Sequence, residues 1–412
     1  MQHLAHLAER YPGIPERALL KAHLLFEGLR LNPTLVEAGR WALPGFKPYA
    51  PTPEERRAGL PAQVPIPYHM TLAGGELVRV KCDAESPYEV RDDVDGALLW
   101  CGDQPVERVA FQPRPGWYDR RSADGRPFST VGLSQHGDML VVNAAPGCEF
   151  FLQKDDAGHS LQCRFCAYGR PDHRTRELGQ EVGQGPIRGD ALERVVEGVV
   201  TALPEVRHIY LVAGSLADNR AEGERYLQLT EALCDAGVRQ VPVTAGPSAL
   251  CREDTAALKA AGAAAVSYNL EVWGHDLFAA ICPGKERFIG YRPWLERLAD
   301  AAEIFGAGSV LTAMVAGIEV DQGLATVDHA LDLATAGADW LLAHGIVPVY
   351  SLHWSTRHAT YGHVSSPAFD YFLRLNERLA ELRRHHHHRV PGQIVCRGCA
   401  YMQLDPDCDA TA

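Results

Sequence analysis

From about residue 136 onward, apolar runs of β-type composition alternate with amphipathic helical stretches roughly every thirty residues. The predicted strands cover residues 139–143, 208–213, 240–244, 264–270, 309–315 and 340–349. The predicted helices cover residues 190–203, 222–236, 253–261, 292–305, 324–334 and 366–384. Strands that are apolar throughout are typical of parallel sheets covered by helices on both faces. Six such units predict an α/β fold, an open (β/α)6 partial barrel whose active face lies at the strand ends.

The first 135 residues follow a different pattern. Apolar positions at helical spacing predict a helix over residues 15–31, and short strand-like runs cover 77–80, 97–101 and 106–111. The proline-rich stretch 44–67 is not a regular element. We therefore predict three parts: an N-terminal α+β accessory region (1–135), a barrel core (136–360), and a C-terminal helix with a Cys-rich extension (361–412).

Composition and charge narrow the function classes. Of 412 residues, 46% are apolar and 22% are charged, which predicts a packed globular protein. The net charge of −12 disfavours binding to a phosphate backbone, so we expect a small-molecule substrate and no nucleic acid. No stretch of eighteen apolar residues and no secretory signal is present, which predicts a cytoplasmic protein without a membrane partner. In a reducing compartment, the eleven cysteines are expected to be ligands, buried thiols or redox groups.

Three cysteines follow the first predicted barrel strand. Cys148 comes shortly after it, fourteen residues separate Cys148 from Cys163, and Cys163 begins the tight C-x2-C pair that ends at Cys166. Three thiolates can bind three irons of a cubane cluster and leave the fourth iron open to an exchangeable ligand. A C-x2-C pair alone suits zinc equally well, with His159 or His173 as a further ligand.

The cysteines and the strand ends that follow them resemble the radical S-adenosylmethionine (radical SAM) family over about residues 137–350. The gap of fourteen residues departs from the family's usual C-x3-C-x2-C motif, but the aromatic residue before the third cysteine is present. Residues that match the family's cofactor-binding segments are Phe165, Gly214, Ser215, Asn269, Glu271, Arg287, Gly317 and Val347. In the family, the residues matched by Asn269 and Glu271 hold the ribose hydroxyls, and a cation such as Arg287 meets the methionine carboxylate.

The resemblance implies a cofactor set and a reaction. Cys148, Cys163 and Cys166 would hold a [4Fe–4S] cluster whose open iron binds S-adenosylmethionine. An electron from a donor such as flavodoxin or ferredoxin would give a 5′-deoxyadenosyl radical. This radical would abstract hydrogen from a small molecule in cofactor or specialised-metabolite biosynthesis. The alternatives are group transfer or sulfur insertion that uses a second cluster, and a non-catalytic metal-binding or sensing protein on the same barrel.

Two further segments contain candidate residues. The segment after the sixth strand is rich in polar aromatic groups, and it either lines the substrate site or forms a surface loop. Its candidate substrate residues are Tyr350, His353, Trp354 and Arg357. Near the C-terminus, Cys396, Cys399 and Cys408 form a C-x2-C-x8-C set. This set suits a second iron–sulfur cluster, a zinc ion completed by one of the histidines 385–388, or unliganded thiols.

Overall fold

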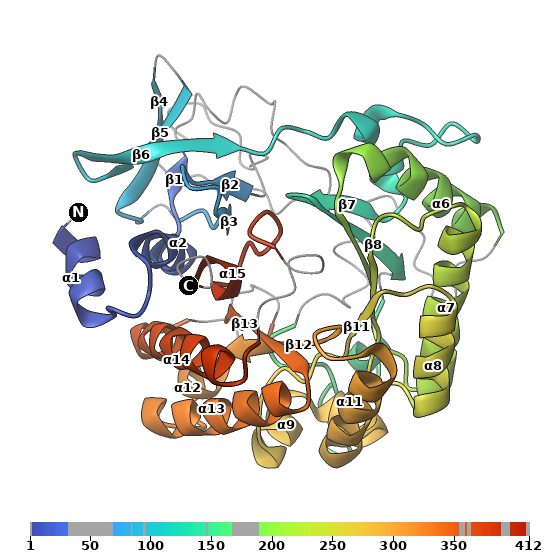
Figure 1. The fold of residues 1–412 in the computed structure, drawn as a ribbon. Helices are drawn as coiled ribbons and strands as arrows, with labels where there is room; N and C mark the ends of the chain where they lie inside the picture. Colours follow the sequence, from blue (N-terminus) through green and yellow to red (C-terminus); the bar gives the residue numbers. More distant parts are fainter. Residues whose placement is uncertain are drawn as a thin grey trace.

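The computed structural model describes residues 2–31, 69–83, 85–93, 96–145, 147–166, 189–353, 359–360, 364–388 and 396–408. The proline-rich stretch predicted to lack regular structure lies outside these ranges, as do the candidate substrate residues Trp354 and Arg357. Two sheets and their helices make up the described part of the chain (Figure 1). None of the described helices combines the length and the apolar character needed to cross a membrane.

The larger sheet has seven strands in the order β13-β12-β11-β10-β9-β8-β7. The strands are β7 (Leu133–His136), β8 (Met139–Ala145), β9 (His208–Ala213), β10 (Val243–Gly246), β11 (Ala265–Ser267), β12 (Val310–Ala316) and β13 (Ile346–Leu352). Neighbouring strands from β8 to β13 are parallel, and β7 pairs antiparallel with β8. The sheet curls into an open half-barrel (Figure 1), so the predicted α/β partial barrel is confirmed.

Helices lie along the outer side of this sheet (Figure 1). They are α6 (Asp190–Ala202), α7 (Asn219–Asp235), α8 (Arg252–Ala260), α9 (His275–Ile281), α10 (Pro283–Phe288), α11 (Tyr291–Phe305), α12 (Ile318–Asp321), α13 (Val327–Ala343) and α14 (Ser366–His385). Side-chain caps fix several starts: Asp218 accepts from two backbone N–H groups of α7, and Thr326 accepts from the His329 N–H of α13. Six of these helices correspond to the predicted ones, with ends shifted by a few residues in most cases.

The predicted strand over residues 340–349 is wrong in its first half. Trp340 to Ala343 form the last turn of α13, and β13 begins only at Ile346. The sequence Trp-Leu-Leu-Ala reads as an apolar run, but Ala338, Leu341 and Leu342 are buried at helical spacing. Gly345, with φ of 73°, makes the turn between the helix and the strand. Both elements are apolar, so hydrophobicity alone did not locate the boundary between them.

The N-terminal region forms a six-stranded sheet in the order β1-β4-β5-β6-β2-β3 with two helices. Its elements are α1 (Gln2–Arg10), α2 (Glu16–Glu27), β1 (Arg30–Leu31), β2 (His69–Thr71), β3 (Leu77–Arg79), β4 (Tyr88–Asp93), β5 (Gly96–Cys101) and β6 (Gln104–Phe111). The three predicted strand runs are confirmed, whereas the predicted helix over residues 15–31 ends early, at Gly28 with φ of 74°. The sequence pattern missed α1, β2 and β4. The domain boundaries themselves stay a prediction.

The C-terminal segment, residues 396–408, lies between the two sheets and contains α15 (Asp405–Cys408) (Figure 1). Its Gly398 carbonyl accepts from the Asp138 N–H at the β7–β8 turn, at 3.2 Å. Its Gln403 forms a bridge with Ser351 on β13, where the amide nitrogen donates to the serine hydroxyl at 2.8 Å. A buried ion pair, Lys21 to Asp407 at 2.6 Å, joins it to α2. The segment therefore connects the N-terminal region to the first strands of the barrel sheet, at the β7–β8 turn, and to its last strand, β13.

Candidate functional site

Cys148 lies three residues beyond the carboxyl end of β8, where the pairing with β9 becomes irregular. The Gly214 N–H donates to the Ala145 carbonyl at 3.1 Å, and the Glu149 N–H donates to the Ser215 carbonyl at 2.9 Å. A Cβ atom on Gly214 would lie 1.9 Å from the Gly147 oxygen and 2.6 Å from the Cys148 Cα. Only glycine at position 214 therefore lets the Cys148 backbone dock on the turn after β9.

The fourteen residues between Cys148 and Cys163 fold back on themselves. A 3₁₀ turn, η3 (Glu149–Phe151), is followed by an antiparallel bridge between Lys154 and Ser160. At the tip, the Asp155 carboxylate accepts from two backbone N–H groups, those of Ala157 at 3.0 Å and His159 at 2.8 Å. The chain thus returns to the strand end from which it left. Beyond it, the Cys166 N–H donates to the Cys163 carbonyl at 2.9 Å, which closes the C-x2-C turn.

The three sulfur atoms interact electrostatically. Burial, together with the charges of the neighbouring Cys163 and Cys166, raises the pKa of Cys148 to about 12. A hydrogen bond from the buried Cys282 thiol lowers the pKa of Cys163, and the charge of Lys285 acts in the same direction. Three thiolates in one buried place repel one another unless cations bind between them. The set of donors therefore fits a positively charged metal centre.

The spacing of these sulfurs bears on the kind of centre. A tetrahedral zinc ion holds two thiolates about 3.8 Å apart. Among the described residues, the one group whose ligand atoms all lie within 4.8 Å of one another does not include Cys148, Cys163 or Cys166. The three sulfurs thus do not form the compact group that one small ion requires. A cubane cluster, in which each thiolate binds a different iron, does not need such a compact group.

A buried lysine organises the residues that follow β11. The Lys285 ammonium group donates to the Asn269 carbonyl at 2.5 Å and to the Glu271 carboxylate at 2.7 Å. It also lies 4.8 Å from the ring of Trp294. Glu271 has a positive φ of 75°, which is a strained conformation for a residue with a side chain and is typical of functional sites. The structure therefore places Asn269 and Glu271 together, beside Lys285. This lysine is not among the candidate site residues predicted from the sequence.

Arg287, the cation predicted from the sequence to bind the cofactor, has a different partner. It is exposed, and its guanidinium donates to the Lys154 carbonyl in the hairpin between the cysteines, at 3.2 Å. Both cations lie in α10, two residues apart, so the helix turns one inward and the other outward. The sequence contained the signal for Lys285, since this residue lies in the same basic segment. Its orientation became visible only in the structure.

The remaining cofactor candidates lie at strand ends or on the inner face of the sheet. Phe165 is partly buried against the main core, between Cys163 and Cys166. Gly317 has φ of 104° and starts α12, and a Cβ atom there would lie 2.8 Å from that of Ala368. Val347 belongs to a small buried cluster with residues of three neighbouring strands, namely Ala265, Leu311 and Val349. These placements fit the family pattern, and the roles of the residues stay predictions.

A buried carboxyl lies near the same strand ends. Burial raises the pKa of Glu319 to about 7, and a hydrogen bond with Tyr371 partly opposes this shift. The Glu319 Oε2 atom has no hydrogen-bond partner. Glu319 lines a small cavity together with Glu271, Trp273 and Tyr350. The region beyond the carboxyl ends of β11 and β12 therefore holds an ionisable group whose contacts are incomplete.

Two of the four candidate substrate residues are described, and both are buried. The Tyr350 hydroxyl donates to the Ala334 carbonyl at 3.3 Å. His353 is 1% exposed, and its Nδ1 atom lies 2.8 Å from the Asp321 carboxylate. Tyr350 reaches the cavity beside Glu319, whereas His353 is enclosed in its contact with α12. Their part in substrate binding stays a prediction.

The second cysteine set is only partly brought together. Cys396 and Cys399 lie with Asp138 and His208, and the ligand atoms of these four residues are all within 4.8 Å of one another. Cys408 is buried in α15 and is not a member of this group. Of the histidines proposed to complete a zinc site, His386 contacts the Asp339 carboxylate at 2.7 Å. Sequence reasoning missed Asp138 and His208, which lie far from the cysteines along the chain.

Comparison with known proteins gives one sequence relative and several solved structures. No family model matches the chain. Bacteriochlorophyllide c C-7(1)-hydroxylase of Chlorobaculum limnaeum is 23% identical over 377 residues, which are 88% of this chain and 83% of that protein. Methylornithine synthase has a TM-score of 0.42 and 10% identity over 62% of this chain and 64% of its own. Coproporphyrinogen III oxidase from Escherichia coli, a radical SAM enzyme, has a TM-score of 0.38 and 11% identity over 63% of this chain and 55% of its own.

All three proteins are enzymes by name, and the two solved structures are matched over less than two thirds of their length. The resemblance to radical SAM enzymes that the sequence predicted therefore stays a prediction at this point. Because the TM-scores are low, we base the proposed chemistry on the residues of this chain and on the sequence relative.

Proposed function

We propose that this chain is a radical SAM enzyme that removes hydrogen from a small-molecule substrate in a biosynthetic pathway. Cys148, Cys163 and Cys166 hold a [4Fe–4S] cluster in this proposal. The observation that supports it best is the mutual electrostatic effect of these three sulfurs at the carboxyl end of the first parallel strand. They come together although fourteen residues separate the first two, because the intervening chain folds back as a hairpin.

The protein's own residues hold the cofactor and exclude water. When bound, the cluster and S-adenosylmethionine supply a 5′-deoxyadenosyl radical by one-electron cleavage. Asn269 and Glu271 are the groups that would accept from the ribose hydroxyls, and Lys285 fixes them by binding the Asn269 carbonyl and the Glu271 carboxylate. Gly214 offers backbone at the position where the family holds the methionine part, close to Cys148. Gly214 and Lys285 are buried and Asn269 and Glu271 are partly buried, which limits the access of water to the reacting atoms.

Hydroxylation is the first reaction to test. The sequence relative is named a hydroxylase of bacteriochlorophyllide c, and the similarity covers 88% of this chain, including most of the N-terminal region. A shared accessory region as well as a shared barrel supports a shared reaction type. We therefore infer that the substrate is a largely apolar ring compound. The carbon radical left by hydrogen removal would lose one electron to an acceptor such as an iron–sulfur cluster and take up the hydroxyl group of a water molecule, with release of a proton.

The alternative of group transfer or sulfur insertion is less well supported. It would use the C-terminal cysteines close to the substrate. Cys396 and Cys399 lie beside Asp138, at the amino end of β8, whereas Cys148 follows the carboxyl end of that strand. A strand of seven residues is about 20 Å long. A sulfur donor at that distance does not reach a substrate held beside Cys148.

Anaerobic incubation with S-adenosylmethionine and dithionite tests the proposal. The protein should contain about four irons at the first site, with matching sulfide, and should release 5′-deoxyadenosine. Absence of this product from fully loaded protein would favour a metal-binding or sensing function. With candidate ring substrates, mass spectrometry should show a gain of one oxygen atom. Release of 5′-deoxyadenosine without any oxygenated product would keep the radical chemistry and reject hydroxylation.

A further inference from the structure

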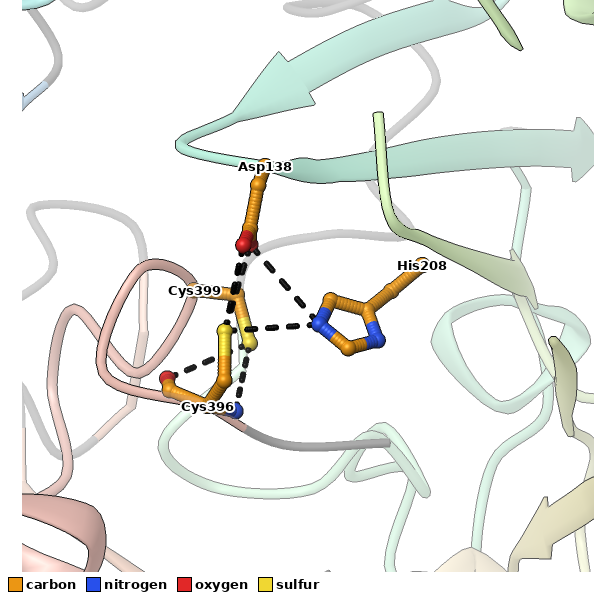
Figure 2. Close-up of side chains that lie close together, drawn as sticks. All are labelled: Asp138, His208, Cys396 and Cys399. Carbon is orange, nitrogen blue, oxygen red and sulfur yellow. Dashed lines mark hydrogen bonds and ion pairs between the residues drawn. The ribbon is translucent and has the colours of Figure 1, made fainter. Parts of the chain in front are cut away.

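Four side chains from distant parts of the sequence converge where the parallel strands of the barrel sheet begin. We call this side the amino edge of the sheet, and the side where these strands end the carboxyl edge. Asp138 lies in the β7–β8 turn, His208 begins β9, and Cys396 and Cys399 belong to the C-terminal segment (Figure 2). Their carboxylate, imidazole and thiol groups point toward one another (Figure 2). All four ligand atoms lie within 4.8 Å of one another, and among the described residues this is the one such group.

The distances match the edges of a tetrahedron around one zinc ion. With zinc at its usual distances from sulfur, nitrogen and oxygen, neighbouring ligand atoms are about 3.4 to 3.8 Å apart. The Cys396 sulfur lies 3.3 Å from His208 Nε2 and 3.2 Å from the Asp138 carboxylate. His208 Nε2 lies 3.9 Å from the other oxygen of that carboxylate. All separations among the four ligand atoms are within 4.8 Å, so the group needs to contract by about 1 Å at most to bind an ion.

The backbone around these side chains is firmly placed before any ion binds. The Asp138 carbonyl accepts from the Arg207 N–H at 2.7 Å, which joins the starts of β8 and β9. The Asp138 N–H donates to the Gly398 carbonyl at 3.2 Å, between the two cysteines. A Cβ atom on Gly137 would lie 1.7 Å from that carbonyl oxygen, so the two segments are in direct backbone contact. Ligands on rigid strands and in a packed turn give a precise site.

We propose that Asp138, His208, Cys396 and Cys399 bind a single zinc ion that fastens the C-terminal segment to the amino edge of the barrel. Two thiolates, one imidazole and one carboxylate are ligand types that zinc accepts. The protein supplies all four positions, which is the pattern of a structural site, because a catalytic site keeps one position open. In this proposal Asp138 and His208 are metal ligands and Cys408, which the sequence pattern grouped with Cys396 and Cys399, is not. It does not depend on the proposed radical chemistry.

An iron–sulfur cluster at this place agrees less well with the geometry. In a [4Fe–4S] cluster the thiolates bind separate irons and therefore stand farther apart than the four atoms found here. The site also lies at the edge of the sheet opposite to Cys148. In barrels of this kind, the carboxyl edge of the sheet carries the chemistry and the amino edge serves stability. The ion is therefore structural: it holds the segment that bridges the N-terminal region and β13.

Metal analysis of the full chain tests the proposal. A triple variant, with Cys148, Cys163 and Cys166 changed to Ala, removes the first metal centre without touching the second. Purified without chelators, this variant should contain about one zinc per chain and no sulfide. No bound metal, or iron with sulfide, would overturn the proposal.

Single substitutions in the triple variant identify the ligands. Cys396→Ala and His208→Ala should each lower the zinc content by about tenfold or more at a fixed concentration of a competing chelator. Cys408→Ala, the matched cysteine control, should leave it unchanged. His208→Cys supplies another zinc ligand and should retain the ion. Loss of zinc in Cys408→Ala, or full retention in Cys396→Ala, would contradict this ligand set.

Cobalt gives a second readout that does not require a ligand variant to fold. Cobalt-loaded triple variant should show the intense visible bands of a tetrahedral site together with a sulfur-to-cobalt charge-transfer band. Weak bands typical of six oxygen ligands would reject the proposed site.

Discussion

The two edges of the barrel sheet hold cysteine sites of opposite character. At the carboxyl edge, three sulfurs from one loop do not form a group that could hold a single ion, and Cys163 and Cys166 help to raise the pKa of Cys148. At the amino edge, four ligand atoms from three distant segments lie within 4.8 Å of one another. The first set supplies three protein ligands and leaves a fourth position open, whereas the second supplies all four. The two sites therefore suit chemistry and stability, respectively.

The surroundings of the two sites also differ, and they too favour chemistry at the carboxyl edge and stability at the amino edge. Near the carboxyl edge, Glu271 has a strained φ of 75° and Glu319 keeps an unpartnered buried oxygen. At the amino edge, the Asp138 backbone N–H and carbonyl are both paired. Strain and incomplete contacts are costly, and proteins retain them mainly at functional sites. We therefore expect the cofactor to bind at the carboxyl edge and not at the amino edge.

Substitution of a cysteine at each edge should have the largest and most contrasting effect. Cys148→Ala should lower 5′-deoxyadenosine formation by at least about 100-fold, because a cluster ligand is lost. Cys399→Ala should leave cofactor cleavage within about threefold of wild type at a temperature where both variants are folded, because its site only fastens the C-terminal segment. The assay is anaerobic incubation followed by chromatography. Similar losses in both variants would remove the distinction between the edges.

The barrel and the first cysteine set could be predicted from sequence for a physical reason. Apolar strands and amphipathic helices are local patterns, and Cys148, Cys163 and Cys166 lie within nineteen residues of one another. The amino-edge group joins Cys396 to His208 and Asp138, which are 188 and 258 residues away. Only the folded sheet brings them together. No short-range pattern marks Asp138 or His208 as a ligand.

The direction of a side chain was equally hard to predict. The sequence placed Lys285 and Arg287 in one basic segment, and the α10 helix turns Lys285 toward Glu271. His353, a candidate substrate residue, is buried against Asp321, and its part in substrate binding stays a prediction. The phase of α10 decides the first case and the path of the chain just after β13 decides the second, and sequence patterns resolve neither.

Loss of the buried ammonium group should destabilise the carboxyl edge. Lys285→Met leaves the Glu271 carboxylate buried without its partner, and should lower the free energy of unfolding by about 3 to 5 kcal/mol. Arg287→Met, an exposed change in the same helix, should cost about 0.5 kcal/mol or less. Urea denaturation measures both. The double variant Lys285→Met with Glu271→Gln should recover most of the loss, and a failure to do so would mean that packing, not charge, is responsible.

The pH dependence of stability should reveal the incomplete contacts of Glu319. Burial raises its pKa from 4.5 to about 7, so the folded state holds the proton more tightly than the unfolded state. The Glu319 contribution to the free energy of unfolding should fall as pH rises from about 4.5 to about 7 and level off above. Glu319→Gln should remove up to about 3 kcal/mol of this change and should be the more stable protein at pH 8. Urea denaturation at several pH values compares the two, and parallel curves would show that Glu319 keeps an ordinary pKa.

The close approach at Gly214 offers the finest test of how the carboxyl edge is built. Gly214→Ala places a Cβ atom 1.9 Å from the Gly147 backbone oxygen, so the Cys148 loop must move. We expect a loss of about 1 to 3 kcal/mol in the free energy of unfolding and a lower iron content, with zinc unchanged. Gly223→Ala is a matched control, because its Cβ atom meets side-chain atoms alone, those of Leu250 at 3.3 Å and Asp254 at 3.6 Å, and alanine favours the helix. If iron and zinc fell together in Gly214→Ala, the two edges would be one cooperative unit, since a shift at one strand end would then disturb ligands at the other.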